Sequence, residues 1–307
     1  MIIKRMDSKE QEIAELETFL KGKLKPSQRS RIERELKTMK SGIQGEKDSA
    51  YYIDFYFGDS KNWAVIHDLR LEHKGQAAQI DHLLMNRFFD IYVLESKNYS
   101  YKLKINPDGE FEAYYEKRYT GISSPIEQNK RHKHLLELFL GSFDILPKRM
   151  GISIRPRLKK FVLVSPKCTI VRPPEKRFDT SCVIKADTLR TRIDRELEKG
   201  SPLTDIATIS KVCSSSTLQR AARRIASFHR PKKMDFASKF GLPAQSFSKA
   251  QNEGTTKERE PKKYSCSRCK RAISERVADY CRQNKGKFGG KVYCFECQKS
   301  AATAKEI

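Results

Sequence analysis

The sequence lacks an apolar run long enough to cross a membrane. Its longest apolar stretches, such as HLLELFL at residues 134–140, are far shorter than the roughly 20 residues that a membrane-spanning helix needs. A secretory leader is also missing, because acidic residues enter the first stretch, MIIKRMDSKEQEIAELE, too early for an apolar leader core. We therefore expect a cytoplasmic protein with no membrane partner.

Acidic residues are scarce relative to basic ones. The chain has 62 lysines and arginines against 38 aspartates and glutamates, a net charge of +24. Residues 229–307 hold +11 of this excess in about a quarter of the chain. A polyanion is the natural partner, and nucleic acid is favoured over a membrane because no amphipathic anchor accompanies the charge. Solubility alone is the other explanation.

The chain is long enough for one main domain and a small module. It has 307 residues, of which 38% are hydrophobic and 33% are charged. Helical spacing over residues 8–22 and 27–42, separated by Pro26, predicts an antiparallel helical hairpin. We predict five parts: an N-terminal helical hairpin (1–41), a core (42–160), a strand and helices completing the main domain (161–229), a basic linker (230–263) and a cysteine-rich module (264–301).

The fold class predicted for the main domain is α/β. After a further helix that Gly58 ends, the runs WAVIHDLRL, AAQIDHLLMN and FFDIYVLESKN follow with short gaps and predict a meander of strands. A hairpin over residues 101–115 turns at NPDG. A helix starts at Ser124, with Pro125 at its first position and Glu127 completing a capping box. KKFVLVSP then predicts a buried strand, and helices follow it.

Ionisable residues interrupt two of the apolar strands. Strand alternation places Asp81 on one face with Leu83 and Met85, and it places Glu95 and Lys97 on a single face of the neighbouring strand. An unpaired carboxylate there would cost several kcal/mol to bury. Two carboxylates can hold Mg²⁺ or Mn²⁺, which polarises a phosphodiester, while the lysine positions water and offsets the developing charge. A structural glutamate–lysine pair is the alternative explanation.

Two further polar residues can join this group. Glu46 opens a predicted helix just before the first strand, where it can supply another oxygen ligand or merely compensate the helix dipole. Gln128 lies seven residues before Leu135, close to the core-facing stripe of its helix. The pattern therefore directs an amide toward the sheet.

Four segments together resemble the NERD (nuclease-related) domain, which is grouped with the PD-(D/E)XK nuclease superfamily. They are QGEKDSAYY, AAQIDHLLM, IYVLESKNY and SPIEQNKRHKHLLELF, and the resemblance covers roughly residues 42–160. It implies a restriction-endonuclease-like core with a mixed sheet flanked by helices. It also implies catalytic roles for the residues at matching positions, which are Glu46, Asp81, Glu95, Lys97 and Gln128. Ile80 stands where the superfamily name has proline, which is ordinary within NERD sequences.

Five cysteines crowd into the C-terminal region. Cys266 and Cys269 form one CxxC pair and Cys294 and Cys297 form another, so the four thiolates can close a tetrahedral zinc site. Cys281 lies between them, either as a buried thiol beside the site or as a replacement ligand. A module this short cannot fold on its own core, and zinc binding can supply on the order of 10 kcal/mol.

Basic and aromatic residues alternate around these cysteines. Basic side chains suit phosphate contacts and aromatic rings suit stacking on bases, although some of the rings must form the core of the module. The segment YCRQNKGKFGGKVYCFECQ resembles the zinc-finger tail of some NERD proteins. The predicted nucleic-acid contacts are Arg268, Lys270, Arg271, Arg282, Lys285, Lys287 and Lys291.

The sequence thus predicts a Mg²⁺-dependent nuclease that acts on nucleic acid, with DNA favoured, and that carries a zinc ribbon. The alternative is a nucleic-acid-binding or adaptor protein whose nuclease fold is inactive. The segment ISKVCSSSTLQRAARRIASF resembles a basic helix-turn-helix, but packing of its amphipathic helix on the core is the favoured interpretation.

Overall fold

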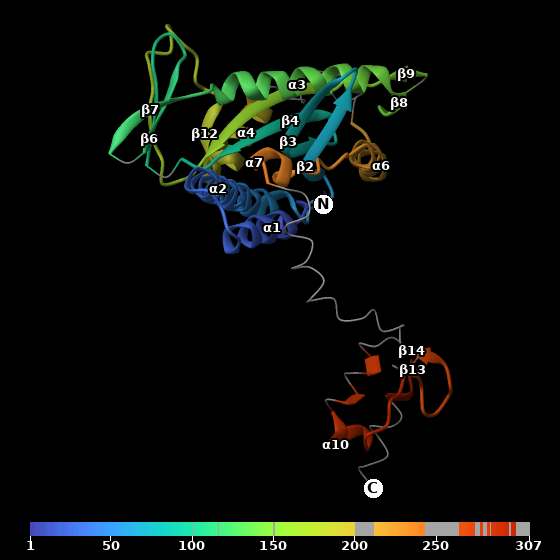
Figure 1. Cartoon of the computed structure of the whole chain (residues 1–307). Helices are drawn as coiled ribbons and strands as arrows, with labels where there is room; N and C mark the ends of the chain where they lie inside the picture. Colours follow the sequence, from blue (N-terminus) through green and yellow to red (C-terminus); the bar gives the residue numbers. More distant parts are fainter. Residues whose placement is uncertain are drawn as a thin grey trace. The chain divides into compact units, whose positions relative to one another are not determined.

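The computed structural model shows two compact units, residues 1–242 and residues 243–307 (Figure 1). The first unit contains all the strands of the predicted meander and the helices around them. The structure describes residues 1–99, 101–115, 117–149, 151–199, 212–242, 264–273, 277–278, 281–282, 284–294 and 296–298.

Two antiparallel helices follow the short first strand, Ile2–Lys4; the helical pair is as predicted, but its second helix is much longer than expected. Helix α1 (Glu10–Lys21) is followed by α2 (Pro26–Phe57), which runs without a break through Gly42 and Gly45. A helical glycine costs only about 1 kcal/mol relative to alanine. The predicted third helix is therefore the second half of α2, and the predicted boundary at residue 42 falls inside a helix.

The predicted meander is confirmed as the centre of a mixed six-stranded sheet. Its three strands pair antiparallel, whereas the strands added at both sides are parallel to their neighbours. The order across the sheet is β1 (Ile2–Lys4), β2 (Trp63–His73), β3 (Gln76–Asn86), β4 (Asp90–Lys97), β10 (Arg157–Val164) and β12 (Val183–Lys185).

Helices cover both faces of this sheet (Figure 1). Helices α3 (Pro125–Ser142) and α6 (Ser215–Ser227) pack on the face that carries Leu83, Val93 and their neighbours. Helix α2 and α4 (Leu189–Lys199), which follows the short 3₁₀ turn η1 (Ala186–Thr188), pack on the other face. Each fully buried aliphatic or aromatic side chain contributes roughly 1.5–3 kcal/mol, so the two layers stabilise the sheet that holds the site.

A second, four-stranded sheet contains the predicted hairpin. Its turn is held by the Asn106 Oδ1 atom, which accepts hydrogen bonds from the backbone N–H groups of Asp108 and Glu110, and Gly109 adopts a φ of +82°. The order across this sheet is β11 (Thr169–Val171), β5 (Lys102–Ile105), β6 (Phe111–Tyr115) and β7 (Arg118–Ile122). Two short strands, β8 (Lys148–Arg149) and β9 (Ile152–Ser153), form a separate hairpin.

Helix α3 starts where the sequence predicts. The Ser124 hydroxyl accepts a hydrogen bond from the Glu127 backbone N–H, and Pro125 takes the first helical position. The carboxylate of Glu127 instead pairs with Lys130 at 2.6 Å. Only the serine half of the predicted capping box is therefore formed, since the lysine one turn along the helix holds the glutamate.

The segment after the sheet differs from the expected linker. Helix α6 packs on the sheet, as predicted, through buried residues that include Leu218 and Ile225. Helix α7 (Phe236–Phe240) then lies within the stretch predicted as a linker, and both of its terminal phenylalanines are buried. A single turn of helix is too short to show periodicity in the sequence. Residues 201–211, which include the first three residues of the helix-turn-helix candidate, and residues 243–263 lie outside the described residues.

The C-terminal unit has its own small framework. Strands β13 (Tyr264–Ser265) and β14 (Ala272–Ile273) pair antiparallel, and α10 (Lys285–Phe288) follows. The α/β fold class, with helical N-terminus, mixed sheet and small cysteine module, is confirmed. Among the helices that the structure describes, none has both the length and the hydropathy to cross a bilayer.

Candidate active site and metal centre

All five predicted catalytic residues line one pocket of about 530 Å³. We call it the catalytic pocket, after the role predicted for these residues. It lies where β3 and β4 separate beside α2 and the first turn of α3, so residues from four elements far apart in sequence meet there. The predicted residues that line it are Glu46, Asp81, Glu95, Lys97 and Gln128.

The Asp81 side chain continues the hydrogen bonding between β3 and β4 at the edge of this pocket, where the backbone pairing ends. The backbone pairing of β3 with β4 extends to His82 and Leu94. One step further, the Asp81 Oδ2 atom accepts a hydrogen bond of 2.7 Å from the Ser96 backbone N–H. Burial, and next the carboxylate of Glu95, raise the pKa of Asp81 well above its usual value. A nearby cation would favour its ionised form.

Glu95 is 2% exposed and lies between two nitrogen groups. Its Oε1 atom pairs with the Lys97 ammonium at 2.7 Å. Its Oε2 atom lies 3.2 Å from His132 Nδ1, yet the geometry gives neither atom a hydrogen-bond partner among the described residues. A buried carboxylate oxygen without a donor is costly, and a bound cation would relieve that cost.

His132 is a site residue that the sequence analysis missed. It lies on α3 four residues after Gln128, and residues at this spacing share a helix face. That spacing was the available signal. Between them, buried Asn129 donates from its Nδ2 atom to the backbone oxygens of Val93 and Phe161, at 3.1 and 2.8 Å. This contact anchors α3 to β4 and β10 and so fixes where both side chains lie.

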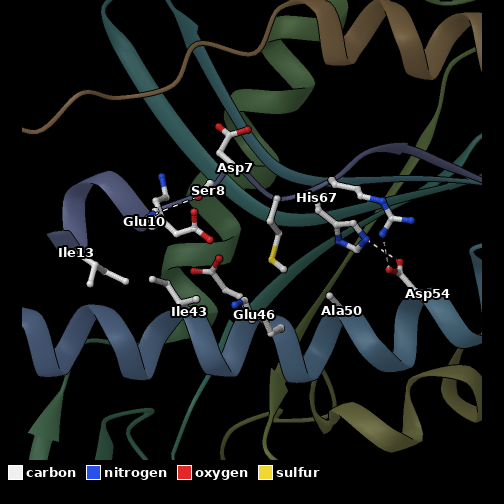
Figure 2. A pocket seen from close by; sticks show the side chains of 13 residues that line it. Asp7, Ser8, Glu10, Ile13, Ile43, Glu46, Ala50, Asp54 and His67 are labelled. Atoms are coloured by element: carbon white, nitrogen blue, oxygen red, sulfur yellow. Dashed lines mark hydrogen bonds and ion pairs between the residues drawn. The ribbon is translucent and has the colours of Figure 1, made fainter. Parts of the chain in front are cut away.

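Glu46 lies at the middle of α2, not at a helix start. Compensation of the helix dipole therefore does not explain it, because that effect fades beyond the first turn. Burial, and next the carboxylate of Asp68, raise the pKa of Glu46 to about 7. Figure 2 shows Glu46 beside a second pocket of about 350 Å³, whose lining also includes Glu10 and Asp54. Glu46 thus borders both pockets.

A chain of hydrogen bonds, buried except at its Asp54 end, crosses the sheet beside the catalytic pocket. With the Asp54 carboxylate as acceptor, His67 donates from Nε2 at 2.9 Å (Figure 2). His67 Nδ1 then accepts from His82 Nδ1 at 2.7 Å, and His82 Nε2 accepts from the Ser96 hydroxyl at 3.0 Å. Burial, and next His67, lower the pKa of His82 well below its usual value, so it is neutral. The chain ends on the residue whose amide holds Asp81.

A divalent cation fits this donor set. Carboxylate oxygens are the ligands that Mg²⁺ prefers, and Mg²⁺ commonly binds through one or two carboxylates while keeping water and substrate phosphate as its other ligands. Asp81 and Glu95 supply two carboxylates, and the Oε2 atom of Glu95 accepts no hydrogen bond within the described part of the chain, with His132 Nδ1 at 3.2 Å beside it. Among the described residues, no carboxylate or histidine forms with Asp81 and Glu95 a set of three whose ligand atoms all lie within 4.8 Å of one another.

The four predicted zinc ligands come together in the C-terminal unit. The sulfur atoms of Cys266, Cys269, Cys294 and Cys297 all lie within 4.8 Å of one another, so they could hold a metal ion such as zinc. Burial alone would raise the pKa of Cys266, but backbone N–H groups, first that of Cys269, lower it to about 6. Such hydrogen bonds favour the thiolate that a metal needs.

Cys281 is buried outside this cluster. Its sulfur atom accepts hydrogen bonds from the backbone N–H of Tyr293 at 3.4 Å and from Gln298 Nε2 at 3.3 Å. The thiol thus fills a structural position, one of the two alternatives that the sequence left open. Phe288 is also buried, with its ring 6.2 Å from that of Tyr293, so these aromatics contribute to the core of the module.

Most of the predicted nucleic-acid contacts are exposed in the same unit. Arg271 makes an ion pair with Glu296 at 3.3 Å, and the Arg282 guanidinium lies 4.7 Å from the centre of the Tyr264 ring. The side chain of Lys287 lies outside the described residues. The exposed residues are Arg268, Lys270, Arg271, Arg282, Lys285 and Lys291.

Residues 41–162 match the family model of the nuclease-related domain, NERD. The predicted resemblance over roughly residues 42–160 is thereby confirmed. The matched segment contains the whole lining of the catalytic pocket except Lys37 and Thr38. No curated protein and no solved structure matches the chain.

Proposed function

Part of this chain matches the nuclease-related domain, and we propose that the protein is a nuclease that hydrolyses phosphodiester bonds of nucleic acid with the help of a divalent cation. The observation that carries the proposal is the catalytic pocket itself. Asp81, Glu95 and Lys97 converge there, and a buried oxygen of Glu95 has no donor among the described residues. DNA is the proposed substrate, and Mg²⁺ or Mn²⁺ the proposed cation.

Asp81 and Glu95 would hold the cation, which when bound polarises the phosphate and lowers the pKa of a bound water. The Ser96 amide occupies one oxygen of Asp81 and so orients the carboxylate. His132, whose Nδ1 atom lies 3.2 Å from the Oε2 atom of Glu95, limits how far that carboxylate can rotate.

Lys97 supplies positive charge where negative charge develops on the phosphate. Its ammonium is held 2.7 Å from Glu95 Oε1, with the side chain 27% exposed, so it can reach both the pocket and its solvent. A preorganised charge of this kind stabilises the transition state because no reorganisation is needed during reaction. Gln128 offers an amide from α3 that can orient the attacking water.

The C-terminal module would hold the substrate. Its four cysteines would bind a structural zinc ion, and the exposed arginines and lysines around them would contact phosphates. Binding should therefore weaken steeply with salt, by roughly one logarithmic unit per phosphate contacted and per tenfold increase in salt.

A Lys97→Ala variant tests the proposed nuclease. We expect plasmid and oligonucleotide cleavage in Mg²⁺ to fall by roughly 10²- to 10³-fold, the usual cost of losing one transition-state contact. DNA affinity measured in EDTA should stay within a few-fold. Lys148→Ala is the matched control, because Lys148 pairs with Asp144 at 2.9 Å and lies outside the catalytic pocket.

Undiminished cleavage by the Lys97→Ala variant would rule out the assigned role. Binding without cleavage in any divalent cation, by the unmodified protein, would instead identify an inactive nuclease fold that acts as a nucleic-acid-binding or adaptor protein.

A further inference from the structure

Four aromatic side chains form an array on the second half of α2. We call Tyr51, Tyr52, Phe55 and Tyr56 the α2 aromatic patch. Tyr51 is 65% exposed, Phe55 71% and Tyr56 42%. The rings of Tyr51 and Phe55 lie 6.4 Å apart, and each has a neighbouring tyrosine ring at 5.3 or 5.0 Å.

Tyr52 is half-buried and packs against the core, but folding does not account for the exposure of the other three rings. Helix α2 buries Ile53 and Phe57 completely, so its core-facing side is already occupied by other residues. Burying a phenylalanine is worth roughly 1.5–3 kcal/mol, yet Phe55 contributes little of this to folding. A contiguous exposed aromatic patch of this kind commonly marks a binding surface.

One part of the α2 aromatic patch lines a hollow that adjoins the catalytic pocket. Tyr51 and Tyr52 line a hollow of about 380 Å³, together with Asn98 and Lys167. Asn98 also lines the catalytic pocket, where it directly follows Lys97. The two hollows therefore adjoin at Asn98. Tyr115, which is 42% exposed, also lines the catalytic pocket.

We propose that the α2 aromatic patch binds the unstacked bases of a single-stranded nucleic acid whose backbone enters the catalytic pocket past Asn98. This inference rests on the proposed function and names the form of its substrate. Every base has a face that can stack on an aromatic ring, and such stacking is tolerant of sequence.

Ring spacing favours a single strand over a duplex. The centres of Tyr51 and Phe55 are 6.4 Å apart, nearly twice the roughly 3.4 Å rise per base of a stacked strand. Two neighbouring bases that each lie on one ring are therefore unstacked from each other, whereas the faces of bases inside a duplex are already covered by their neighbours. Nucleic-acid modules that read single strands combine exposed rings with basic groups in this way.

Charge favours a nucleic acid over a second copy of this chain. Residues 1–228 alone carry a net charge of +13, so two copies repel each other, whereas a polyanion is attracted. Lys167 is exposed in the hollow beside Tyr51, where it can contact a phosphate of a strand whose bases lie on the rings.

A full-length Tyr51→Ala/Phe55→Ala double variant tests the proposal. Both side chains are mostly exposed, so the fold should be retained. In EDTA, we expect affinity for a 12-nucleotide single-stranded DNA to fall at least tenfold, as for other base–aromatic stacks. Affinity for a duplex of the same sequence should change less than twofold. Tyr119→Ala, which removes an exposed ring of β7 outside both hollows, is the matched control.

Photocrosslinking of the unmodified protein gives a second readout. An oligonucleotide with 5-iodouracil should crosslink within the tryptic peptide that contains Tyr51 and Phe55. Equal losses of single-strand and duplex affinity, or crosslinks confined to other peptides, would overturn the proposal. A change of oligomeric state in the double variant, with single-strand affinity retained, would assign the patch to a second copy instead.

The same experiment separates this proposal from the proposed nuclease activity. Loss of single-strand affinity in the double variant, with no cleavage by the unmodified protein, would support the binding surface while the nuclease assignment fails. Active cleavage of single strands that is unaffected by the double variant would support the nuclease and overturn the binding surface.

Discussion

At the scale of single residues, the main feature of the catalytic pocket is its buried carboxylates. Glu95 has a lysine on one oxygen and no hydrogen-bond donor on the other within the described residues. Asp81 and Glu46 both have a raised pKa, first of all because of burial. Such carboxylates destabilise a fold when they ionise without a partner. Several such carboxylates in one pocket are the pattern expected of a functional site.

The Glu46 carboxyl gives a pH-dependent prediction. Its pKa is about 7 in the folded protein, against a usual value near 4.5. Between these values the folded state keeps a proton that the unfolded state releases, so stability declines as pH rises from about 4.5 to 7. In EDTA, we expect Glu46→Gln to raise the free energy of unfolding at pH 8 by roughly 1–3 kcal/mol, and hardly at pH 4.5.

Urea unfolding at pH 4.5, 6 and 8 measures this difference. Glu137→Gln, on the exposed side of α3, provides the control and should show no such pH dependence. A Glu46→Gln effect that is the same at all three pH values would contradict the raised pKa.

Helix α2 brings the parts of the site together at the scale of elements. It carries Glu46 into the catalytic pocket, and it carries the α2 aromatic patch beside it. The helix approaches the end of β4 very closely at Gly45, where a Cβ atom would lie 2.6 Å from the Asn98 Cβ atom. The Asn98 Nδ2 atom also donates to the backbone oxygen of Ser41 at 2.9 Å. A side chain at position 45 would push these elements apart.

Two glycines of α2 provide a matched pair of substitutions. A Cβ atom added at Gly42 would have no atom within 4 Å that it could clash with. We therefore expect Gly42→Ala to stabilise the protein by up to about 1 kcal/mol through helix propensity. Gly45→Ala has the same propensity gain but should lower the free energy of unfolding, because Asn98 and the backbone around it must move. It should also reduce cleavage, since Asn98 adjoins Lys97.

Thermal unfolding and cleavage rates of the two variants are the measurements. If Gly45→Ala stabilised the protein as much as Gly42→Ala does, the close approach of α2 to β4 would be wrong.

The whole molecule combines two units with different sources of stability. Residues 1–242 bury three apolar clusters around two sheets. Within residues 243–307, the described strands have two residues each, and four cysteines lie together. We therefore expect the second unit to depend on a metal ion bound by these cysteines, and the first unit to depend on its apolar clusters.

Cys294→Ser tests this division of stability. We expect the variant to lose stoichiometric zinc in metal analysis and to become sensitive to proteolysis within residues 264–298. The main thermal transition, which belongs to the first unit, should shift by less than about 1 °C because additivity holds for independent units. A Cys168→Ser variant is the control, since Cys168 is buried in the first unit outside the four-cysteine cluster. Retained zinc and unchanged proteolysis would refute the metal site.

Local pattern was sufficient for the meander, for the start of α3 and for the four-cysteine cluster. Alternating apolar residues, a serine–proline helix start and paired CxxC motifs each act over a few neighbouring residues. The same patterns predicted α2 as two separate helices, because glycine is typical of a helix end. Gly45 instead lies inside the helix, where it allows the close approach to Asn98. These patterns also missed α7, because its two phenylalanines are buried only through contacts with distant parts of the chain such as α2.

The sequence by itself determined which residues could form a metal-dependent site, since charged side chains on apolar strands are costly and therefore noticeable. Only the tertiary structure decided how they meet. The oxygen of Glu95 without a donor, the approach of His132, the hydrogen-bond chain from Asp54 to Ser96 and the adjoining hollows at Asn98 all join elements distant in the chain. Packing of helices on both faces of the sheet creates these contacts, and no local pattern encodes them.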